Sequence, residues 1–186
     1  MCGIIGYSGP KEPLPILING LSRLEYRGYD SAGIAISDGN KITVEKKEGK
    51  LEVLKNHLKD NNIKGNIGIG HTRWATHGVP NDVNAHPHSD NNEEFAIIHN
   101  GIIENYAEIK KDLLEEGFEF KSDTDTEVVA VELSRKWNGQ LLKTVTDVAK
   151  TLEGTYALVV TTTKEEGTIV AGRLMSPCLL YTSPSP

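Results

Sequence analysis

A cysteine stands directly behind the initiator methionine, and its position makes it the first candidate for chemistry in the chain. Methionine aminopeptidase removes Met1 when the next residue is small, so the mature chain would begin with Cys2. One carbon would then carry a thiol and a free α-amine, whose reference pKa of about 7.7–8.0 lies below that of lysine. The amine can accept the thiol proton, as in enzymes whose N-terminal residue is both nucleophile and base.

Two other interpretations of Cys2 are open at this position. As a small apolar residue, it suits the start of a buried strand. A lipid anchor would need an apolar signal segment upstream, where only Met1 stands. Cys2 by itself favours the buried strand, and the polar clusters elsewhere in the chain reverse that preference.

A second cluster, residues 71–78, is predicted to end one strand and to open a long polar loop that reaches residue 92. Its Arg73 suits a grip on a small carboxylate through two parallel hydrogen bonds, a geometry that lysine cannot copy. The alternative is a solvated strand end with polar residues gathered by chance. An earlier cluster, Tyr26-Arg27-Gly28-Tyr29-Asp30, favours a packed polar wall over a simple tight turn.

The last cluster pairs Asn100-Gly101 with the start of a predicted helix at residues 124–137. A side-chain amide beside a glycine N–H at a strand end can form an oxyanion hole, although a plain turn is the alternative. Asp125 can bind an ammonium group or simply favour the first turn of the helix. Asp123, more than Ser122, is predicted to cap that helix.

The six histidines do not predict a metal site, although His86 and His88 lie two residues apart with His71 and His77 nearby. No cysteine pair and no one-turn helical histidine spacing accompanies them. The glycines form no phosphate-binding pattern. We therefore expect neither a metal nor a cofactor.

The predicted elements indicate an α+β domain. Because strands often follow strands directly, a regular βαβ ladder is excluded. Strands are predicted at residues 3–8, 32–37, 41–46, 66–72, 95–99, 155–163 and 168–171, and helices at 14–24, 51–58, 103–116, 124–137 and 141–152.

The composition indicates one globular domain of 186 residues and 20.4 kDa. A formal charge of −6 without a basic stripe argues against nucleic acid as a partner. No apolar run reaches membrane-spanning length, and no targeting segment is recognisable. Two cysteines at opposite ends form no disulfide framework, so we expect a cytoplasmic protein.

The carboxyl end needs separate treatment. Residues 178–186 read Cys-Leu-Leu-Tyr-Thr-Ser-Pro-Ser-Pro, which resembles the translation of a common sequencing adapter. We interpret this run as a cloning or assembly artefact, with a disordered Ser/Pro tail as the alternative. Residues 1–177 are then the domain, and its last strands are expected to be missing.

Taken together, the clusters resemble the glutaminase domains of the glucosamine-6-phosphate synthase family, which are class II, N-terminal-nucleophile glutamine amidotransferases. The amidophosphoribosyltransferases and asparagine synthetases look similar in the terminal cysteine and the Arg-Gly pair but differ elsewhere. The resemblance runs from Cys2 to about Arg173, and its most specific parts are Cys2-Gly3-Ile4, Leu24-Glu25-Tyr26-Arg27-Gly28-Tyr29-Asp30-Ser31-Ala32-Gly33, His71-Thr72-Arg73-Trp74-Ala75-Thr76-His77-Gly78, Asn84-Ala85-His86-Pro87-His88 and His99-Asn100-Gly101-Ile102-Ile103-Glu104-Asn105.

This resemblance implies a four-layer αββα N-terminal-nucleophile hydrolase sandwich, truncated at its C-terminal end. It implies that Cys2 attacks the side-chain amide of L-glutamine, forms a γ-glutamyl thioester and releases ammonia for amino-sugar synthesis. It also implies that Asn100 and Gly101 form the oxyanion hole and that Arg27 orders the surroundings of the nucleophile. Arg73 would bind the carboxylate of glutamine, and Asp125 would bind its ammonium group. Thr76 and His77 would belong to a loop that closes over glutamine, and Trp74 would line the pocket.

The resemblance also implies partners that would bind outside this domain. Fructose 6-phosphate would bind only through two sugar-isomerase domains that are absent here, and the full-length protein is expected to be a homo-oligomer. The alternatives are the glutaminase domain of a related enzyme, such as an amidophosphoribosyltransferase, and a non-catalytic glutamine-binding module.

Overall fold

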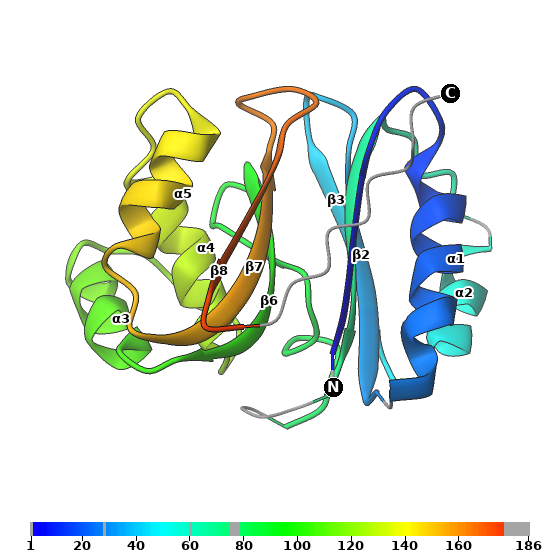
Figure 1. The fold of residues 1–186 in the computed structure, drawn as a ribbon, viewed down its shortest axis with the longest axis horizontal. Helices are drawn as coiled ribbons and strands as arrows, with labels where there is room; N and C mark the ends of the chain where they lie inside the picture. The colour runs from blue at the N-terminus through cyan, green and yellow to red at the C-terminus, as the bar shows by residue number, and fades with distance from the viewer. Residues whose placement is uncertain (1, 28, 60, 75–78, 177–186) are drawn as a thin grey trace.

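The chain folds into four layers, with two antiparallel sheets face to face and helices on both outer sides (Figure 1). The computed structural model describes residues 2–27, 29–59, 61–74 and 79–176. The predicted α+β sandwich with αββα layering is confirmed. The predicted artefact at residues 178–186 lies outside the described residues and stays a prediction.

The first sheet is covered by two helices that the leucine spacing predicts. Leu17 and Leu21 of the first helix are fully buried against the sheet. The helix approaches closely because the strand beneath it carries glycine: a Cβ on Gly68 would lie 2.8 Å from the Leu17 side chain. In spatial order the strands are β1 (Gly3–Ser8), β4 (Ile67–Arg73), β2 (Ser31–Ser37) and β3 (Ile42–Glu48), and the helices are α1 (Pro13–Leu24), which leads into the 3₁₀ turn η1 (Glu25–Arg27), and α2 (Leu51–Leu58).

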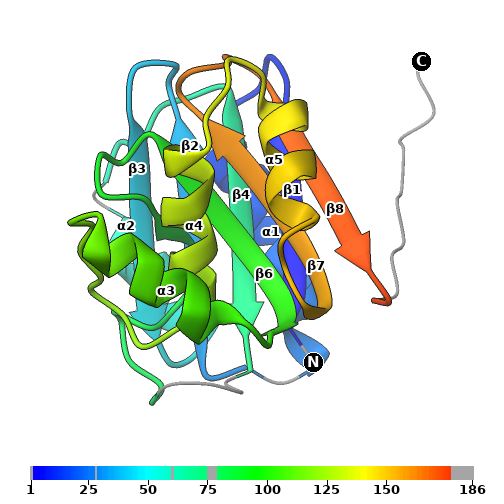
Figure 2. The same cartoon turned by 90° about the vertical axis from the view of Figure 1, so that its left-hand side faces the viewer.

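The second sheet is covered by three helices, which lie across its outer face in Figure 2. Phe95, Ile97 and Leu133 belong to the core between this sheet and its helices. No helix among the described residues is long and apolar enough to cross a lipid bilayer. The strands, in order, are β5 (His88–Ser89), β6 (Phe95–Ile103), β7 (Gly154–Thr162) and β8 (Ile169–Leu174), and the helices are α3 (Tyr106–Glu115), α4 (Asp125–Arg135) and α5 (Leu141–Ala149).

The layer between the two sheets changes from apolar to polar toward one end. Ile69 of β4 packs against Ala96 and Ile98 of β6 in this layer. Because strand side chains alternate between faces, every second residue along each strand returns to the same side. His71 and Arg73 therefore continue the inner face of β4, and Asn100 continues the inner face of β6.

Two predicted boundaries near Asn100 are wrong. The strand does not end at His99: β6 runs on to Ile103, so Asn100 and Gly101 lie inside it, opposite residues 157 and 156 of β7. The following helix begins at Tyr106 rather than at Ile103. An Asn-Gly pair is a local turn signal, but here pairing with β7 outweighs it, and the φ of +122° at Gly101 is one that glycine adopts without strain.

The predicted cap of α4 is also wrong. Thr124 is the N-cap, and its hydroxyl accepts a hydrogen bond from the backbone N–H of Glu127 at 3.3 Å. Ser122 instead donates its hydroxyl to the Glu127 carboxylate at 2.6 Å, and the Asp123 N–H donates to the side chain of Asn84. The tertiary contact with Asn84 takes Asp123 out of the capping position and leaves Asp125 as the first residue of the helix.

Candidate active site

Four segments that carry predicted site residues meet around a pocket of about 210 Å³ at the polar end of the layer between the sheets. They are the residue before β1, the end of β4, the middle of β6 and the first turn of α4. The structure thus brings together six residues predicted from sequence. The pocket is lined by Cys2, His71, Arg73, Trp74, His86, His99, Asn100, Gly101, Ile102, Thr124, Asp125, Thr126 and Thr155.

A larger cavity, of about 320 Å³, lies between α5 and the edge strand β8. Leu142, Val145 and Leu174 are among its lining residues, together with Lys150 and Arg173. It contains none of the residues predicted to do chemistry, so the smaller pocket is the candidate active site.

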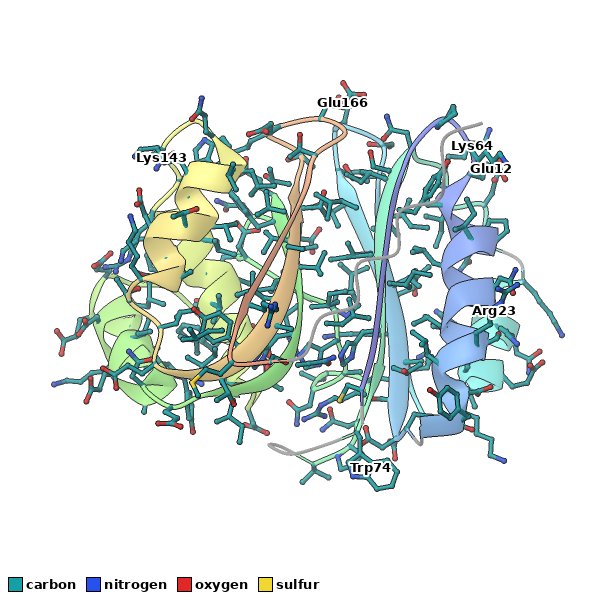
Figure 3. The ribbon with its side chains drawn as sticks, in the orientation of Figure 1. Glu12, Arg23, Lys64, Trp74, Lys143 and Glu166 are labelled. Carbon is teal, nitrogen blue, oxygen red and sulfur yellow. The ribbon has the colours of Figure 1, made fainter. Side chains whose placement is uncertain are left out.

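Cys2 is held at the mouth of the pocket by the pairing of β1 with β4. Gly3 lies opposite Thr72 in this ladder, and its N–H donates to the Thr72 hydroxyl at 3.2 Å. The Cys2 thiol is therefore next to Trp74, whose N–H donates to Sγ at 3.2 Å. Trp74 itself is 55% exposed and projects from the lower edge of the molecule in Figure 3. Its backbone, more than its ring, positions the sulfur.

The Asn100 carboxamide bridges the two sheets beside this thiol. Its Nδ2 donates to the carbonyl oxygen of Cys2 at 3.4 Å. Its Oδ1 lies 2.7 Å from Nε2 of His71, on β4. The neighbouring Gly101 has no room for a side chain, because a Cβ there would collide with the carbonyl oxygen of Thr155. Backbone and carboxamide donors can therefore both lie close to a group bound at Cys2.

Asp125 contributes a buried carboxylate from the first turn of α4. Its Oδ2 accepts the N–H of Ile103 at 2.9 Å, and its Oδ1 accepts the Thr126 hydroxyl at 3.3 Å. The oxygen of that hydroxyl lies 2.8 Å from Nε2 of His86 and 2.9 Å from Nδ1 of His99. The carboxylate is thus held by a polar network beneath the pocket.

Arg73 brings the opposite charge to the same pocket. It ends β4 on the inner face and is 4% exposed, while Asp125 is 6% exposed. A guanidinium and a carboxylate along one small pocket match a ligand with a carboxylate at one end and an ammonium near it. An α-amino acid has that distribution of charge.

Three predicted site residues are not described. Thr76 and His77 lie outside the described residues, and the side chain of Arg27 does as well. Conversely, the sequence predicted no role for His99 or Thr126, which line the pocket beside Asp125. Strand alternation offers a signal for His99: if Asn100 faces the other sheet, its neighbour faces α4.

Burial favours the neutral form of three histidines in or beside the pocket, which are His71, His86 and His88. Burial lowers the pKa of His71 to about 4, and it lowers the pKa of both His86 and His88 well below the usual value. The ring centroids of His71 and His86 are 4.6 Å apart, and those of His86 and His88 are 4.9 Å apart. Among the described residues, no three side chains of the types that bind metals are arranged around a common point.

These shifts predict a loss of stability in acid. In the unfolded chain each histidine has a pKa of about 6.5, so below that pH the unfolded state binds more protons. The stabilisation is complete above pH 6.5 and is lost progressively below that pH, down to about pH 4 in the case of His71. The free energy of unfolding should decrease by about 1.4 kcal/mol per pH unit for each such histidine.

Urea unfolding at several pH values between 7 and 4.5 measures this slope. His88→Gln should reduce the slope by about 1.4 kcal/mol per unit, since one of the groups is removed. The exposed His57 offers a matched control, because His57→Gln removes a histidine without removing a buried one. Equal slopes in wild type and His88→Gln would contradict the prediction.

Comparison with known proteins shows which family the chain belongs to. A family model described as a glutamine amidotransferase domain matches residues 55–184, well over half of the chain. Two curated relatives are glutamine–fructose-6-phosphate aminotransferases (isomerizing). The one from Clostridium perfringens is 53% identical over 180 residues, and the one from Fusobacterium nucleatum is 58% identical over 161 residues.

The chain spans only part of these relatives. The alignments cover 97% and 86% of this chain but 30% and 26% of the two relatives. Among solved structures, the glutamine phosphoribosylpyrophosphate amidotransferase from B. subtilis, complexed with ADP and GMP, matches with a TM-score of 0.74. It is 31% identical, over 88% of this chain and 35% of that one. The chain belongs to the glutamine amidotransferase family, in the class whose domains fold as this αββα sandwich.

Proposed function

We propose that this chain is the glutaminase part of a glutamine–fructose-6-phosphate aminotransferase and releases ammonia from the side chain of L-glutamine. One observation carries the proposal. The Cys2 thiol, the Asn100 carboxamide and the charged pair Arg73 and Asp125 come from four separate segments and line one pocket. The identity of 53% and 58% to two such aminotransferases supports it.

The first step uses Cys2 after removal of Met1. The free α-amine accepts the thiol proton, and the thiolate attacks the carbonyl carbon of the glutamine side-chain amide. The amine then returns the proton to the departing nitrogen, and ammonia leaves. This forms a γ-glutamyl thioester on Cys2, which water hydrolyses to glutamate.

The second requirement is stabilisation of the negative charge that develops on the amide oxygen. Asn100 Nδ2 and the Gly101 N–H are the proposed donors. Preorganised donors aimed at such an oxygen act where water is excluded and do not need to reorganise during the reaction. The contact of Asn100 Nδ2 with the carbonyl oxygen of Cys2, at 3.4 Å, supports its placement beside the reacting sulfur.

The third requirement is recognition of the amino-acid end of glutamine. We assign the carboxylate to Arg73 and the ammonium to Asp125. Thr76 and His77 are proposed to belong to a loop that closes over the ligand, Trp74 to line the pocket, and Arg27 to order the surroundings of the nucleophile. The two buried charges favour an α-amino acid over a simple amide.

Substitution of Arg73 tests this recognition. Hydrogen bonds to charged groups contribute about 1.5–3 kcal/mol each, so Arg73→Ala should raise the Michaelis constant for glutamine roughly ten- to a hundredfold. Arg73→Lys should not restore binding, because an ammonium cannot form the planar fork. The rate of glutamate release by the intact protein, measured against glutamine concentration, gives the result.

A matched control makes the same arginine-to-lysine change outside the pocket. Arg135 pairs with Glu116 and Glu132 on the helix side of the second sheet, so Arg135→Lys should leave the Michaelis constant unchanged. If Arg73→Ala also left it unchanged, the carboxylate assignment would be wrong.

The wider activity extends beyond this chain, which spans 30% of the Clostridium perfringens relative. We propose that the ammonia is used to aminate fructose 6-phosphate in the remaining part of a longer homo-oligomeric protein of the cytoplasm. An amidophosphoribosyltransferase is the second candidate, and the lower identity of 31% to that solved structure ranks it behind. A non-catalytic glutamine-binding module would bind glutamine without releasing glutamate.

A further inference from the structure

We propose that His71 is a positioning residue that decides which end of the Asn100 carboxamide faces the pocket. The proposal rests on the function proposed above, in which Asn100 donates to the forming oxyanion. His71 itself lies on β4, is 1% exposed, and reaches Asn100 of β6 across the space between the sheets.

A carboxamide has a donor end and an acceptor end of almost the same shape. Only the NH₂ end can stabilise an oxyanion, whereas the carbonyl oxygen would repel it. A rotation of the Asn100 amide by half a turn would therefore convert the oxyanion hole into its opposite without moving the backbone. The hydrogen-bond partners of Asn100 must therefore favour one of the two orientations.

Two neighbours of Asn100 make that distinction. The carbonyl oxygen of Cys2 can only accept, and it receives the Asn100 NH₂ at 3.4 Å. The Asn100 oxygen then faces Nε2 of His71 at 2.7 Å, and this contact is a hydrogen bond only if Nε2 carries the proton. The tautomer of His71 with its proton on Nδ1 would present an acceptor instead and would attract the NH₂ end away from the pocket.

The surroundings of His71 favour the Nε2–H tautomer. Its Nδ1 is buried and has no hydrogen-bond partner among the described residues. A proton on Nδ1 would thus be a buried donor without an acceptor, while the Asn100 oxygen would lose its donor. Burial lowers the pKa of His71 to about 4, so the ring stays neutral near pH 7. The groups near it that can carry a positive charge, His99 and Arg73, lower this pKa further.

Kinetics of two His71 variants test the proposal in the intact protein. His71→Leu removes the donor, and the misoriented amide should lower kcat for glutamine hydrolysis about ten- to a hundredfold. The Michaelis constant should stay within about threefold, because Arg73 and Asp125 are untouched. His71→Gln restores an N–H donor at similar reach and should recover most of kcat. Ile69→Val, two residues earlier on the same face of β4, is the packing control.

A double-mutant cycle separates positioning from a general structural role. In an Asn100→Ala background there is no carboxamide to orient, so adding His71→Leu should lower kcat by less than about twofold. If His71→Leu lowered kcat by the same factor in both backgrounds, the proposal would be overturned. If Asn100→Ala alone left kcat unchanged, the oxyanion role of Asn100 would fail instead, whatever His71 does.

The tautomer can be read directly even if His71→Leu does not fold. Nitrogen-15 NMR of the histidine rings in the wild-type protein distinguishes a protonated Nε2 from a bare one. We expect His71 to carry its proton on Nε2 at pH 7. A proton on Nδ1 would refute the proposed orientation of Asn100 without any assay of activity.

Discussion

Replacement of Cys2 by alanine is expected to abolish glutamine hydrolysis and covalent labelling by a glutamine-like diazoketone. The Cys2 sulfur lines the pocket, 3.2 Å from the backbone nitrogen of Trp74, and no other described residue offers a thiol there. Loss of a nucleophile leaves only the effect of binding and the oxyanion donors, so the rate should fall by at least about a thousandfold. Cys2→Ser should behave similarly, because a hydroxyl is a much weaker nucleophile.

Two controls make this result specific. Cys178→Ala removes the other cysteine of the chain, and labelling should continue at Cys2. Mass spectrometry of the intact protein should show that the reactive form has lost Met1, since the retained methionine would block the α-amine. Labelling that persists in Cys2→Ala would exclude Cys2 as the nucleophile.

Replacement of Asn100 by alanine should lower kcat about a hundred- to a thousandfold, the cost typical of removing one oxyanion donor. The Michaelis constant for glutamine should change little, because the donor matters when charge develops and not when glutamine first binds. Asn100→Asp should be at least as damaging, since a carboxylate repels the oxyanion. Initial rates of glutamate release over a range of glutamine concentrations separate the two parameters.

Ile98→Val is a suitable control for Asn100→Ala. Ile98 is on the same face of β6, two residues earlier, and it packs only in the apolar layer between the sheets. This variant should fold with a small loss of stability and unchanged kcat. If Asn100→Ala raised the Michaelis constant and spared kcat, Asn100 would be a binding residue and the oxyanion donor would have to be sought elsewhere.

The sequence by itself determined the elements whose signals are local. Leu17 and Leu21 recur at helical spacing and are buried on α1, as predicted. The hairpin signal at residues 38–40 places Ser37 opposite Ile42, as β2 and β3 show. Such patterns are readable because helical and strand periodicity follow from backbone geometry and need no distant partner.

Tertiary pairing decided the features that local signals predicted wrongly. Asn100-Gly101 resembles a turn, but nine residues of β6 pair with β7, and the strand continues through it. Asp123 has the chemistry of a cap, but Asn84, 39 positions earlier in the chain, binds its backbone and Thr124 caps instead. In both cases, a contact that is distant in sequence outweighed a local preference.

The candidate site divides in the same way. The residue types made Cys2, Arg73, Asn100 and Asp125 candidates for a nucleophile, a carboxylate ligand, an oxyanion donor and an ammonium ligand, and the family resemblance implied those roles. Only the packing of β4 against β6 brings His71 within 2.7 Å of Asn100. The proposed orientation of that amide depends on this contact between two sheets, which no spacing along the chain encodes.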